Sequence, residues 1–387
     1  MAEDRLGYLV LTELFLPTKG GTAVWFDEVY RRIGDRSTHI VTADVPGGVQ
    51  YDASHANTIH RITLQRRWWL RPESLGMYAK LLAKALSLGF RHQFDAVHAG
   101  RVLPEGLVGW IVARMIGRPL VIYAHGEEIT TWRQSGKFRA MVFAYRHADR
   151  VVANSDFTRG ELLKLGVAPE RIVLISPGVD LDRFRPGLVS ADLRASLGIS
   201  DGQKLILSVG RLSRRKGFDQ VIQSIPALVQ KGIDARYAII GIGEDRDYLA
   251  SLAREQGVAE RVHLLGHVST DDLPRWYNAA DLFAMPNREI GGDTEGFGMV
   301  FLEAAACGKP ALAGLAGGTG AAVVDEVTGL SVDGASLDAV SSGLIRLLRD
   351  AELSRRMGER GRERAVGEFA WEHVAAKTRY LDCLKTS

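Results

Sequence analysis

The sequence predicts an α/β protein made of two doubly wound domains, each with a parallel sheet, that face each other across a cleft. Three observations lead to this fold class. The 387 residues are enough for two ordinary domains. Short, apolar, β-rich runs alternate with helical patterns along the chain, which is typical of βαβ units. These runs form two series, separated by the stretch 177–187, which is punctuated by proline and glycine.

Six strands are expected in each series, with helical patterns between them such as 217–231 and 244–257. The first series is 7–12, 39–42, 95–99, 120–125, 150–155 and 172–176, and the second is 204–210, 236–241, 262–266, 281–286, 310–314 and 330–332. We place the boundary between the domains after residue 180. Because ligands of doubly wound sheets bind beyond the carboxyl ends of the strands, functional residues are expected just after strands.

Composition excludes several classes of protein. Hydrophobic residues make up 46% of the chain and charged residues 25%, which indicates a globular protein. The net charge of +3 is too small to suggest a nucleic-acid partner. The two cysteines form neither a metal-ligand spacing nor a disulfide framework, which fits a reducing cytosol. The N-terminus lacks a basic segment before its apolar run, and no run of 18 apolar residues occurs. We expect a cytoplasmic protein whose membrane contact, if it has one, is peripheral.

The stretch "EGFGMVFLEAAACGKP" holds two glutamates eight residues apart, Glu295 and Glu303. The apolar run 299–307 predicts a short buried helix that ends at Gly308. Glu295 then lies just before the helix and Glu303 inside it. An ionised carboxylate there is costly unless a partner satisfies it, and the free amides of the helix start can bind an anion. A ligand with a diol and a phosphate would fit both features. The competing interpretation is a buried glutamate paired with a structural arginine.

Three further groups follow predicted strands. Gly20 and Gly21 precede a helix that starts near Thr22, and a Gly-Gly loop there can cradle phosphate or be a simple turn. His125 ends a strand, so it is either a cleft residue or a structural histidine. Arg211 and Lys216 stand at a strand-to-helix junction, where two cations can neutralise a diphosphate. Between them, Arg214 and Arg215 are interpreted as a solvated basic turn.

Two other patterns are rejected. The segment "IIGIGEDRDYL" (239–249) has Arg246 where a dinucleotide-binding loop needs its third glycine, so NAD binding is not expected. Two Asp-x-Asp triplets occur, at 180–182 and 245–247, but neither follows an apolar strand end. We therefore expect no metal and no resident cofactor, with the Arg/Lys pair supplying the positive charge instead.

The segment 64–92 combines arginines and tryptophans with an amphipathic helical pattern. Tyr78, Leu81, Leu82, Ala85 and Leu88 form an apolar stripe, with Lys80, Lys84 and Arg91 on the other side. Such a segment can lie in the interface of an anionic membrane. The competing interpretation is an ordinary surface helix with its core face.

With these motifs together, the chain resembles family 4 of the retaining glycosyltransferases, which have the GT-B fold of two Rossmann-like domains. The resemblance rests on "SVGRLSRRKGFDQVIQSI", on the segment 263–310 with its E-x7-E pair, and on "EFAWEHVAAKTRYL", in the family's order. Within the family the chain looks most similar to phosphatidylinositol mannosyltransferases and other GDP-mannose-dependent members. The resemblance implies an acceptor-binding domain 1–180, a donor-binding domain 181–370, and a last helix within 371–387 that crosses back to the first domain.

The resemblance also implies roles for individual residues. Glu303 would bind the donor ribose, Glu295 the donor sugar, and Arg211 with Lys216 the diphosphate. His125 would lie near the reacting carbon. The remaining expected donor contacts are Gly20 and Gly21 near the diphosphate, Gly266, His267 and Val268 at the base, and Phe297, Gly298, Met299 and Val300 at the sugar and phosphate. One departure is that many relatives carry Pro-Glu after a glycine pair, where this chain has Thr319 and Gly320 after Gly317 and Gly318.

The expected reaction is transfer of a hexose, with mannose from GDP-mannose preferred, to a hydroxyl of a sugar, polyol or lipid-linked acceptor. A UDP-sugar donor, a GT-B-fold nucleotide-sugar epimerase and a non-catalytic nucleotide-sugar-binding protein are the alternatives. An epimerase would turn over its donor without any acceptor.

Overall fold

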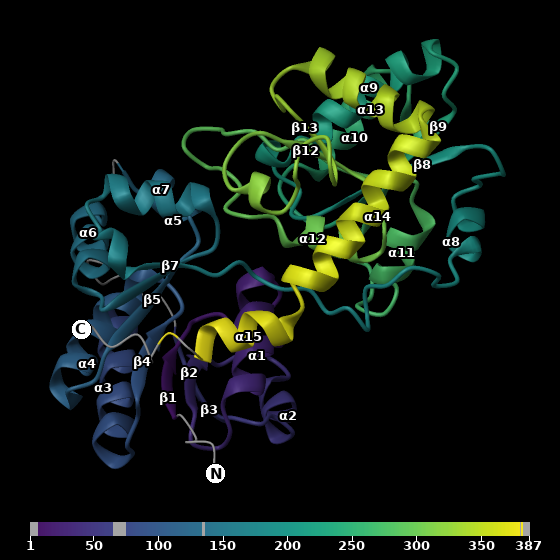
Figure 1. Cartoon of the computed structure of the whole chain (residues 1–387). Coiled ribbons are helices and arrows are strands. Elements are labelled where there is room, and N and C mark those ends of the chain that lie inside the picture. The colour runs from purple at the N-terminus through teal and green to yellow at the C-terminus, as the bar shows by residue number, and fades with distance from the viewer. Residues whose placement is uncertain (1–6, 65–74, 134–135, 380, 382–387) are drawn as a thin grey trace. The chain divides into compact units, whose positions relative to one another are not determined.

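The computed structural model of the chain describes residues 7–64, 75–133, 136–379 and 381. The chain divides into two compact units, and each is described by itself. Unit 1 consists of Met1–Pro177 and Trp371–Ser387, and unit 2 of Gly178–Ala370 (Figure 1). The division lies three residues before the boundary we placed after residue 180.

Unit 1 contains a parallel sheet of seven strands in the order β3-β2-β1-β4-β5-β6-β7. The strands are β1 (Tyr8–Leu11), β2 (His39–Ala43), β3 (Thr58–Ile62), β4 (Ala96–Ala99), β5 (Leu120–Ala124), β6 (Arg150–Ala153) and β7 (Ile172–Leu174). Strand order reverses between β1 and β4, which pair directly, with Leu9 opposite Val97. The loops after β1 and β4 therefore meet at the switch point, where ligands of such sheets bind.

Strand β3 was not predicted. Its sequence "TIHRI" carries a histidine and an arginine, and all five residues are only half-buried. It is an edge strand that pairs with β2 alone in the described part of the sheet. An edge strand needs no continuous apolar run, so the pattern that identifies the buried strands does not mark this one.

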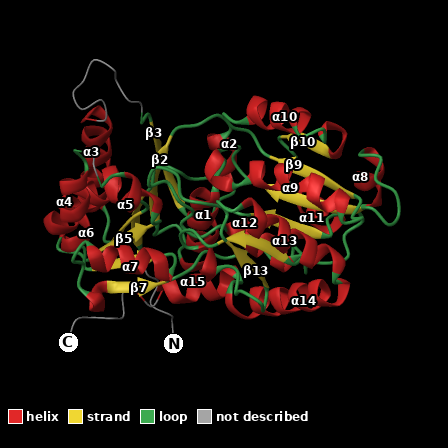
Figure 2. Cartoon of the chain, turned by 90° about the horizontal axis from the view of Figure 1, so that it is seen from above, coloured by secondary structure: helices red, strands yellow, loops and turns green. Residues whose placement is uncertain are grey.

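Helices cover the sheet of unit 1 (Figure 2). They are α1 (Gly21–Ile33), α2 (Gly48–Ala53), α3 (Leu75–Arg91), η1 (Val102–Gly106), α4 (Leu107–Ile116), α5 (Glu127–Thr131), α6 (Phe138–His147), α7 (Asp156–Lys164), η2 (Pro169–Arg171) and α15 (Trp371–Arg379). Helix α15 lies beside α1 (Figure 1), and Arg32 Nε donates a hydrogen bond to the Glu372 carboxylate at 2.9 Å. The C-terminal helix thus belongs to the first unit.

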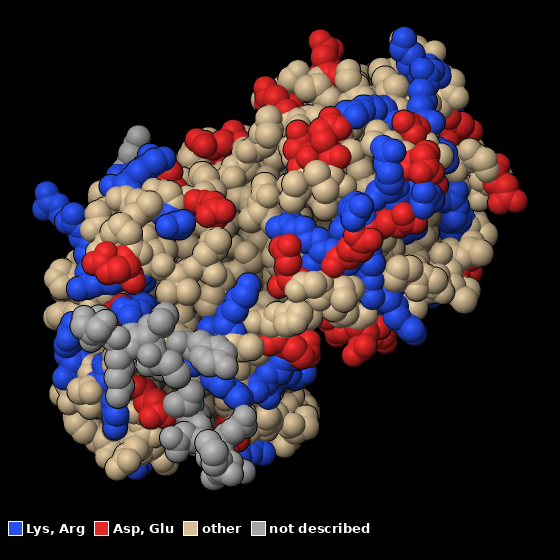
Figure 3. Space-filling model, in the orientation of Figure 1, with Lys and Arg blue, Asp and Glu red and all other residues tan. Residues whose placement is uncertain are grey.

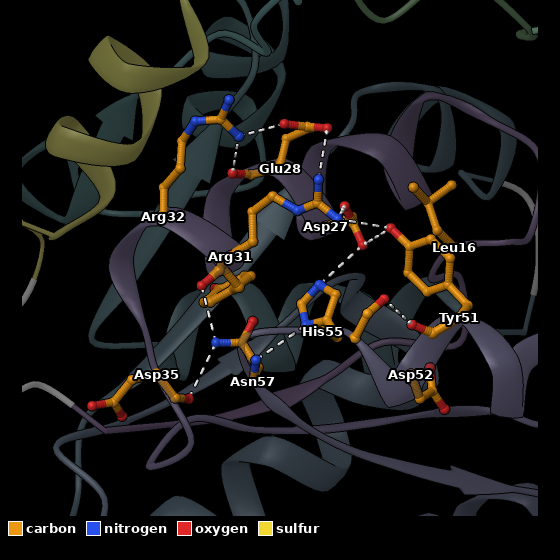
Figure 4. A network of polar contacts seen from close by, with 12 residues as sticks. Leu16, Asp27, Glu28, Arg31, Arg32, Asp35, Tyr51, Asp52, His55 and Asn57 are labelled. Carbon is orange, nitrogen blue, oxygen red and sulfur yellow. Dashed lines mark hydrogen bonds and ion pairs between the residues drawn. The ribbon is translucent and has the colours of Figure 1, made fainter.

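A polar network fixes α1 against α2 (Figure 4). Asp27 of α1 is fully buried and accepts a hydrogen bond from the Tyr51 hydroxyl at 2.6 Å. The same carboxylate oxygen lies 3.2 Å from His55 Nε2, and Arg31 forms an ion pair with the other oxygen at 3.0 Å. Because Tyr51 comes from α2 and His55 from the loop before β3, the network holds the helix that begins at the Gly-Gly loop.

Unit 2 contains a parallel sheet of six strands in the order β10-β9-β8-β11-β12-β13. The strands are β8 (Lys204–Val209), β9 (Ala235–Ile240), β10 (Val262–Gly266), β11 (Leu282–Met285), β12 (Ala311–Gly314) and β13 (Gly329–Val332). They match the second predicted series to within one residue at every end. Here the strand order reverses between β8 and β11, where Leu207 pairs with Phe283. The segments that follow these two strands carry the candidate site.

Helices flank this sheet as well (Figure 2). They are α8 (Ala191–Ser196), η3 (Arg214–Lys216), α9 (Phe218–Gln230), α10 (Arg246–Glu255), η4 (Ala259–Arg261), α11 (Leu273–Ala279), α12 (Met299–Ala306), η5 (Thr319–Ala321), α13 (Leu337–Arg349) and α14 (Ala351–Glu368). Acidic and basic side chains alternate along the exposed side of α14 (Figure 3). Its pairs follow helical spacing, such as Arg355 with Glu359 at 2.6 Å, so this is a solvated face.

Among the described residues, no helix combines the length and the apolar character needed to cross a bilayer.

Candidate functional site

The centre of the candidate site in unit 2 is the carboxylate of Glu295, which follows β11. Its Oε2 accepts hydrogen bonds from Lys216 Nζ and, at 3.0 Å, from an Arg215 guanidinium nitrogen. Lys216 follows β8, so the two strands at the switch point bring these groups together. Lys216 is only 9% exposed. A lysine is rarely so buried unless its charge is paired, and here Glu295 is the partner.

The charges around Glu295 determine its ionisation. Burial by itself raises the pKa of the Glu295 carboxyl. The charges of Lys216 and Arg215, and their hydrogen bonds, outweigh burial and hold the pKa below its ordinary value. Glu295 is therefore an ionised carboxylate at neutral pH, paired with two cations.

Arg215 was wrongly interpreted as part of a solvated turn. Its side chain is only 15% exposed, and it contacts Asp293 at 3.1 Å as well as Glu295. Its carbonyl oxygen accepts a hydrogen bond from the Arg288 backbone amide at 2.8 Å. Arg288 in turn binds Asp219 of α9 through two hydrogen bonds of 3.0 and 2.7 Å. These contacts brace the loop after β11 against the start of α9.

Arg211 and Arg214 lie differently from Lys216. The Arg211 side chain is 76% exposed, and its nearest acid is Glu244 at 3.5 Å. Of the expected pair, only Lys216 contacts the carboxylate of Glu295. Arg214 is partly exposed, pairs with Asp245 at 3.4 Å and packs over the Tyr248 ring. The interpretation as a solvated basic turn thus fits Arg214 better than Arg215.

Glycines shape the backbone around Glu295. Gly298 precedes α12 with φ 87°, and a Cβ there would come within 2.7 Å of the Phe301 ring. Gly317 also has positive φ, and its Cβ would lie 2.1 Å from the Glu295 carbonyl oxygen. That carbonyl accepts a hydrogen bond from the Gly318 amide at 2.7 Å. The glycine pair, which this chain keeps although the Pro-Glu after it is absent, therefore supports the backbone of Glu295.

Helix α12 begins at Met299, as predicted. Met299 and Val300 are its first two residues and are half-buried, while Phe297 is buried before them. The amides of a first helical turn have no partner within the helix and favour an anion. Thr319, which stands where relatives carry proline, is buried and donates its hydroxyl proton to the Gly314 carbonyl at 2.6 Å.

Glu303 lies inside α12 and is half-buried. The Tyr277 hydroxyl donates a hydrogen bond to its Oε2 at 2.7 Å. Burial raises the pKa of the Glu303 carboxyl to about 7, against the opposing effects of Tyr277 and of the Arg183 charge. For Glu303, the competing interpretation of a pair with a structural arginine is wrong. The hydrogen-bonding partner of Glu303 is a tyrosine. Tyr277 was not singled out from the sequence.

The expected base-binding stretch follows β10. Gly266 has φ 68°, and its carbonyl oxygen accepts a hydrogen bond from the Gly241 amide at 2.8 Å. His267 is exposed and Val268 half-buried. The histidine side chain therefore lies at the surface just after β10.

Gly20, Gly21 and His125 belong to unit 1. Gly20 has φ 133° and caps α1, and a Cβ built on it would meet nothing within 4 Å. His125 directly follows β5, and its Nε2 lies 2.8 Å from the Gly100 carbonyl oxygen. A carbonyl only accepts, so Nε2 carries the proton and Nδ1 is left as an acceptor in the neutral ring. The Trp25 ring packs edge-on against this imidazole.

The helix predicted within 64–92 is α3, and its apolar stripe is a core face. Leu81, Ala85 and Leu88 are buried. Tyr78 and Leu82 pack against the same core of unit 1. Lys80 and Arg91 are exposed, and so is Phe90, while Lys84 is half-buried. The arginines and tryptophans at 66–71 lie outside the described residues.

In the described part of the chain, no three His, Cys, Asp or Glu side chains gather closely enough to hold a metal ion.

Comparison with known proteins decides the family. The profile described as Glycosyltransferase Family 4 matches residues 19–183, and the one described as Glycosyl transferases group 1 matches residues 189–364. The chain belongs to the family 4 glycosyltransferases. The two matched segments correspond to unit 1 and unit 2.

Similarity to curated relatives extends over nearly the whole length of this glycosyltransferase. It is 31% identical over 95% of its chain, and 96% of the relative, to a GDP-mannose-dependent alpha-(1-6)-phosphatidylinositol monomannoside mannosyltransferase of Mycolicibacterium smegmatis. It is 29% identical over 94% of both chains to the GDP-mannose-dependent enzyme for the monoacylated form of that lipid in Corynebacterium glutamicum. A D-inositol 3-phosphate glycosyltransferase of Salinispora tropica is 32% identical over 92% of this chain and 79% of its own.

Solved structures show that the fold is GT-B. Anabaena Alr3699/HepE in complex with UDP and glucose matches with a TM-score of 0.80, 23% identity and coverage of 97% and 98% of the two chains. Sucrose-phosphate synthase from Thermosynechococcus elongatus matches with the same TM-score, 22% identity and the same coverage.

Proposed function

We propose that this glycosyltransferase is a retaining mannosyltransferase that moves mannose from GDP-mannose to a hydroxyl of an inositol-containing, lipid-linked acceptor. The observation that carries the proposal is the ionised Glu295 bound by Lys216 and Arg215 beside the free amides of α12. It is joined by full-length similarity to relatives named as GDP-mannose-dependent.

The proposed roles follow the charges that develop in the reaction. Breaking a glycosyl–phosphate bond leaves negative charge on the diphosphate, which Lys216, Arg211 and the amides of α12 stabilise. Glu295 accepts hydrogen bonds from the donor sugar's hydroxyls, and Glu303 from the ribose. The roles of Gly20, Gly21 and His125 near the diphosphate and the reacting carbon rest on the family resemblance, as does retention of configuration.

We further propose that these cations act in place of a resident metal. Lys216 and Arg215 already stand at the carboxylate that would orient the donor sugar. Under this proposal an excess of a chelator such as EDTA leaves transfer unchanged. Loss of activity in EDTA, restored by Mg²⁺ or Mn²⁺, would contradict it.

The proposed acceptor rests on the names of the relatives and on the charge of α3. The relatives named as mannosyltransferases and as inositol 3-phosphate enzymes share inositol in their acceptors' names. Lys80 and Arg91 add exposed positive charge on α3, and Lys84 between them is half-buried; this charge suits a peripheral approach to anionic lipid. Binding to anionic vesicles at low salt tests this part, and lack of binding would remove the membrane contact from the proposal.

A UDP-sugar donor is the second candidate. The structural neighbour solved with UDP and glucose favours it.

A thermal-shift screen with GDP, UDP, ADP, NAD and the corresponding nucleotide-sugars tests the donor. A ligand at about 100 times its dissociation constant adds about 2.7 kcal/mol to the free energy of unfolding. We expect the largest shift with GDP-mannose. A larger shift with a UDP-sugar would replace the donor, and no shift with any nucleotide would contradict the proposed site.

A further inference from the structure

We propose that Tyr277 is a positioning residue that holds Glu303 in the orientation in which it accepts hydrogen bonds from the donor's ribose. This inference rests on the proposed function of Glu303. Tyr277 lies on α11 and Glu303 on α12, 26 positions later in the chain.

The position of the Tyr277 hydroxyl is fixed by packing. The side chain has no exposed surface, and its ring packs against Phe184 and Phe283 at centroid distances of 5.8 and 5.7 Å. A ring held on these sides has no other rotamer to adopt without opening the core. The hydroxyl therefore reaches Glu303 Oε2 at 2.7 Å from a rigid support.

The hydrogen bond leaves the rest of the carboxylate available. Tyr277 occupies one lone pair of Oε2, and a carboxylate offers about four in total. Among the described residues, no group hydrogen-bonds Oε1. Glu303 is half-buried rather than enclosed, so a ligand can approach it. A vicinal diol presents two O–H donors, which is the complement of such a carboxylate.

Tyr277 also favours the charged form that a diol requires. Burial raises the pKa of the Glu303 carboxyl, while the Tyr277 hydrogen bond and the Arg183 charge lower it. Two other groups lie on this side of α12. The Cys307 thiol has its pKa raised to about 12 by burial and stays neutral, and Arg362 of α14 donates to the Ala306 carbonyl at 2.8 Å. Among these groups, Tyr277 is the one that hydrogen-bonds the carboxylate directly.

Tyr277→Phe tests the inference, because it keeps the packed ring and removes only the hydroxyl. The measurement is the dissociation constant of GDP-mannose by calorimetry between pH 5.5 and 8.5, where a nucleotide-sugar diphosphate does not titrate. Affinity of the wild type should rise with pH through about 7. We call this rise of affinity the pH limb. In the variant we expect the pH limb to lie about one pH unit higher. Binding then weakens about fivefold at pH 7 but stays within about 1.5-fold at pH 8.5.

Tyr237→Phe is the matched control. Tyr237 is also fully buried in unit 2, and its hydroxyl lies 2.7 Å from Ser208 Oγ, away from Glu303. This variant should lower thermal stability without moving the pH limb. If Tyr277→Phe gives a pH profile parallel to the wild type, or if both variants move the limb equally, the inference is overturned.

A ribose-specific readout separates positioning from general damage. At pH 7, Tyr277→Phe should weaken GDP about fivefold and 2′,3′-dideoxy-GDP not at all, since the latter offers Glu303 no diol. Equal weakening of both ligands would overturn the inference. Should Tyr277→Phe fail to fold, Tyr277→3-fluorotyrosine keeps the hydroxyl and makes it a stronger donor. The limb should then move to lower pH, and an unmoved limb would count against the inference.

Failure of the inference can be told from failure of the proposed function. If the wild type binds neither GDP nor GDP-mannose at any pH, both the inference and the proposed function are contradicted. If it binds GDP much better than dideoxy-GDP, but Tyr277→Phe behaves as the wild type, only the role of Tyr277 is wrong.

Discussion

Glu295 and Lys216 show how residue spacing in the sequence becomes a site. Both follow strands, and strands β8 and β11 are neighbours at the point where the strand order of unit 2 reverses. Their side chains therefore meet although 79 positions separate them. The sequence predicted these two residues because the R-x4-K and E-x7-E patterns mark them. It missed Arg215 because an arginine in a run of basic residues is expected to be solvent-exposed. Its carboxylate partners become known only from the structure.

Lys216→Ala should lower kcat by about 10²–10³-fold, because it removes a preorganised cation from the leaving diphosphate. Glu295 keeps Arg215 as a partner, so the variant should remain folded. The measurement is steady-state transfer from the nucleotide-sugar, together with circular dichroism of the variant.

Arg214→Ala is the control from the same turn. Its side chain is half exposed and pairs with Asp245 instead of Glu295. We expect its kcat to stay within about threefold of the wild type, the effect usual for an exposed ion pair. Equal losses in the two variants would mean that Lys216 acts only through the fold.

At the scale of elements, the buried strands and the helix α12 were predicted closely. Apolar runs between glycines and prolines leave few alternatives, and α12 begins at the expected Met299. Strand β3 was missed because its residues are half-buried and polar in part. The hydrogen bond from Tyr277 of α11 to Glu303 of α12 was also missed. An aromatic residue in a short helix is expected to be a core residue, and its hydroxyl gives no separate signal in the sequence.

Asp219→Ala should lower the free energy of unfolding by about 3–5 kcal/mol, because it leaves Arg288 largely buried without its carboxylate. Chemical denaturation measures this change. Arg346→Ala, which removes an equally bidentate but exposed pair with Glu326, should leave the denaturation midpoint unchanged. If Asp219→Ala lowers the free energy of unfolding no more than Arg346→Ala does, the ion pair between α9 and the loop after β11 does not stabilise the fold.

The histidines that join β2, β3 and α3 should make unit 1 sensitive to acid. Burial, with the charge of Lys84 and the neighbouring His39 and His92, lowers the pKa of His60 to about 4. The unfolded chain binds a proton at about pH 6.5, so stability is lost as the pH falls from there toward 4. We expect His60 to account for about 1–2 kcal/mol of this loss after screening by solvent.

His60→Gln tests this, because glutamine does not titrate. Denaturation at pH 7 and pH 4.5 should show a smaller loss of stability in the variant than in the wild type. The same loss in both proteins would place the acid sensitivity elsewhere.

At the scale of the molecule, each unit has its own parallel sheet and its own switch point, and each matches its own family profile. Alternating strands and helices predicted this architecture without any knowledge of contacts. The proposed donor site could be located from the sequence, because its residues lie in local motifs of unit 2. No comparable motif for the proposed acceptor could be identified in unit 1.

The proposed mannosyltransferase activity is best tested by transfer of labelled mannose from GDP-mannose to phosphatidylinositol mannosides in mixed micelles. We expect a labelled lipid with the wild type and at most about one hundredth of that rate with Lys216→Ala. No labelled lipid from GDP-mannose, together with robust transfer from a UDP-sugar under the same conditions, would contradict the proposed activity.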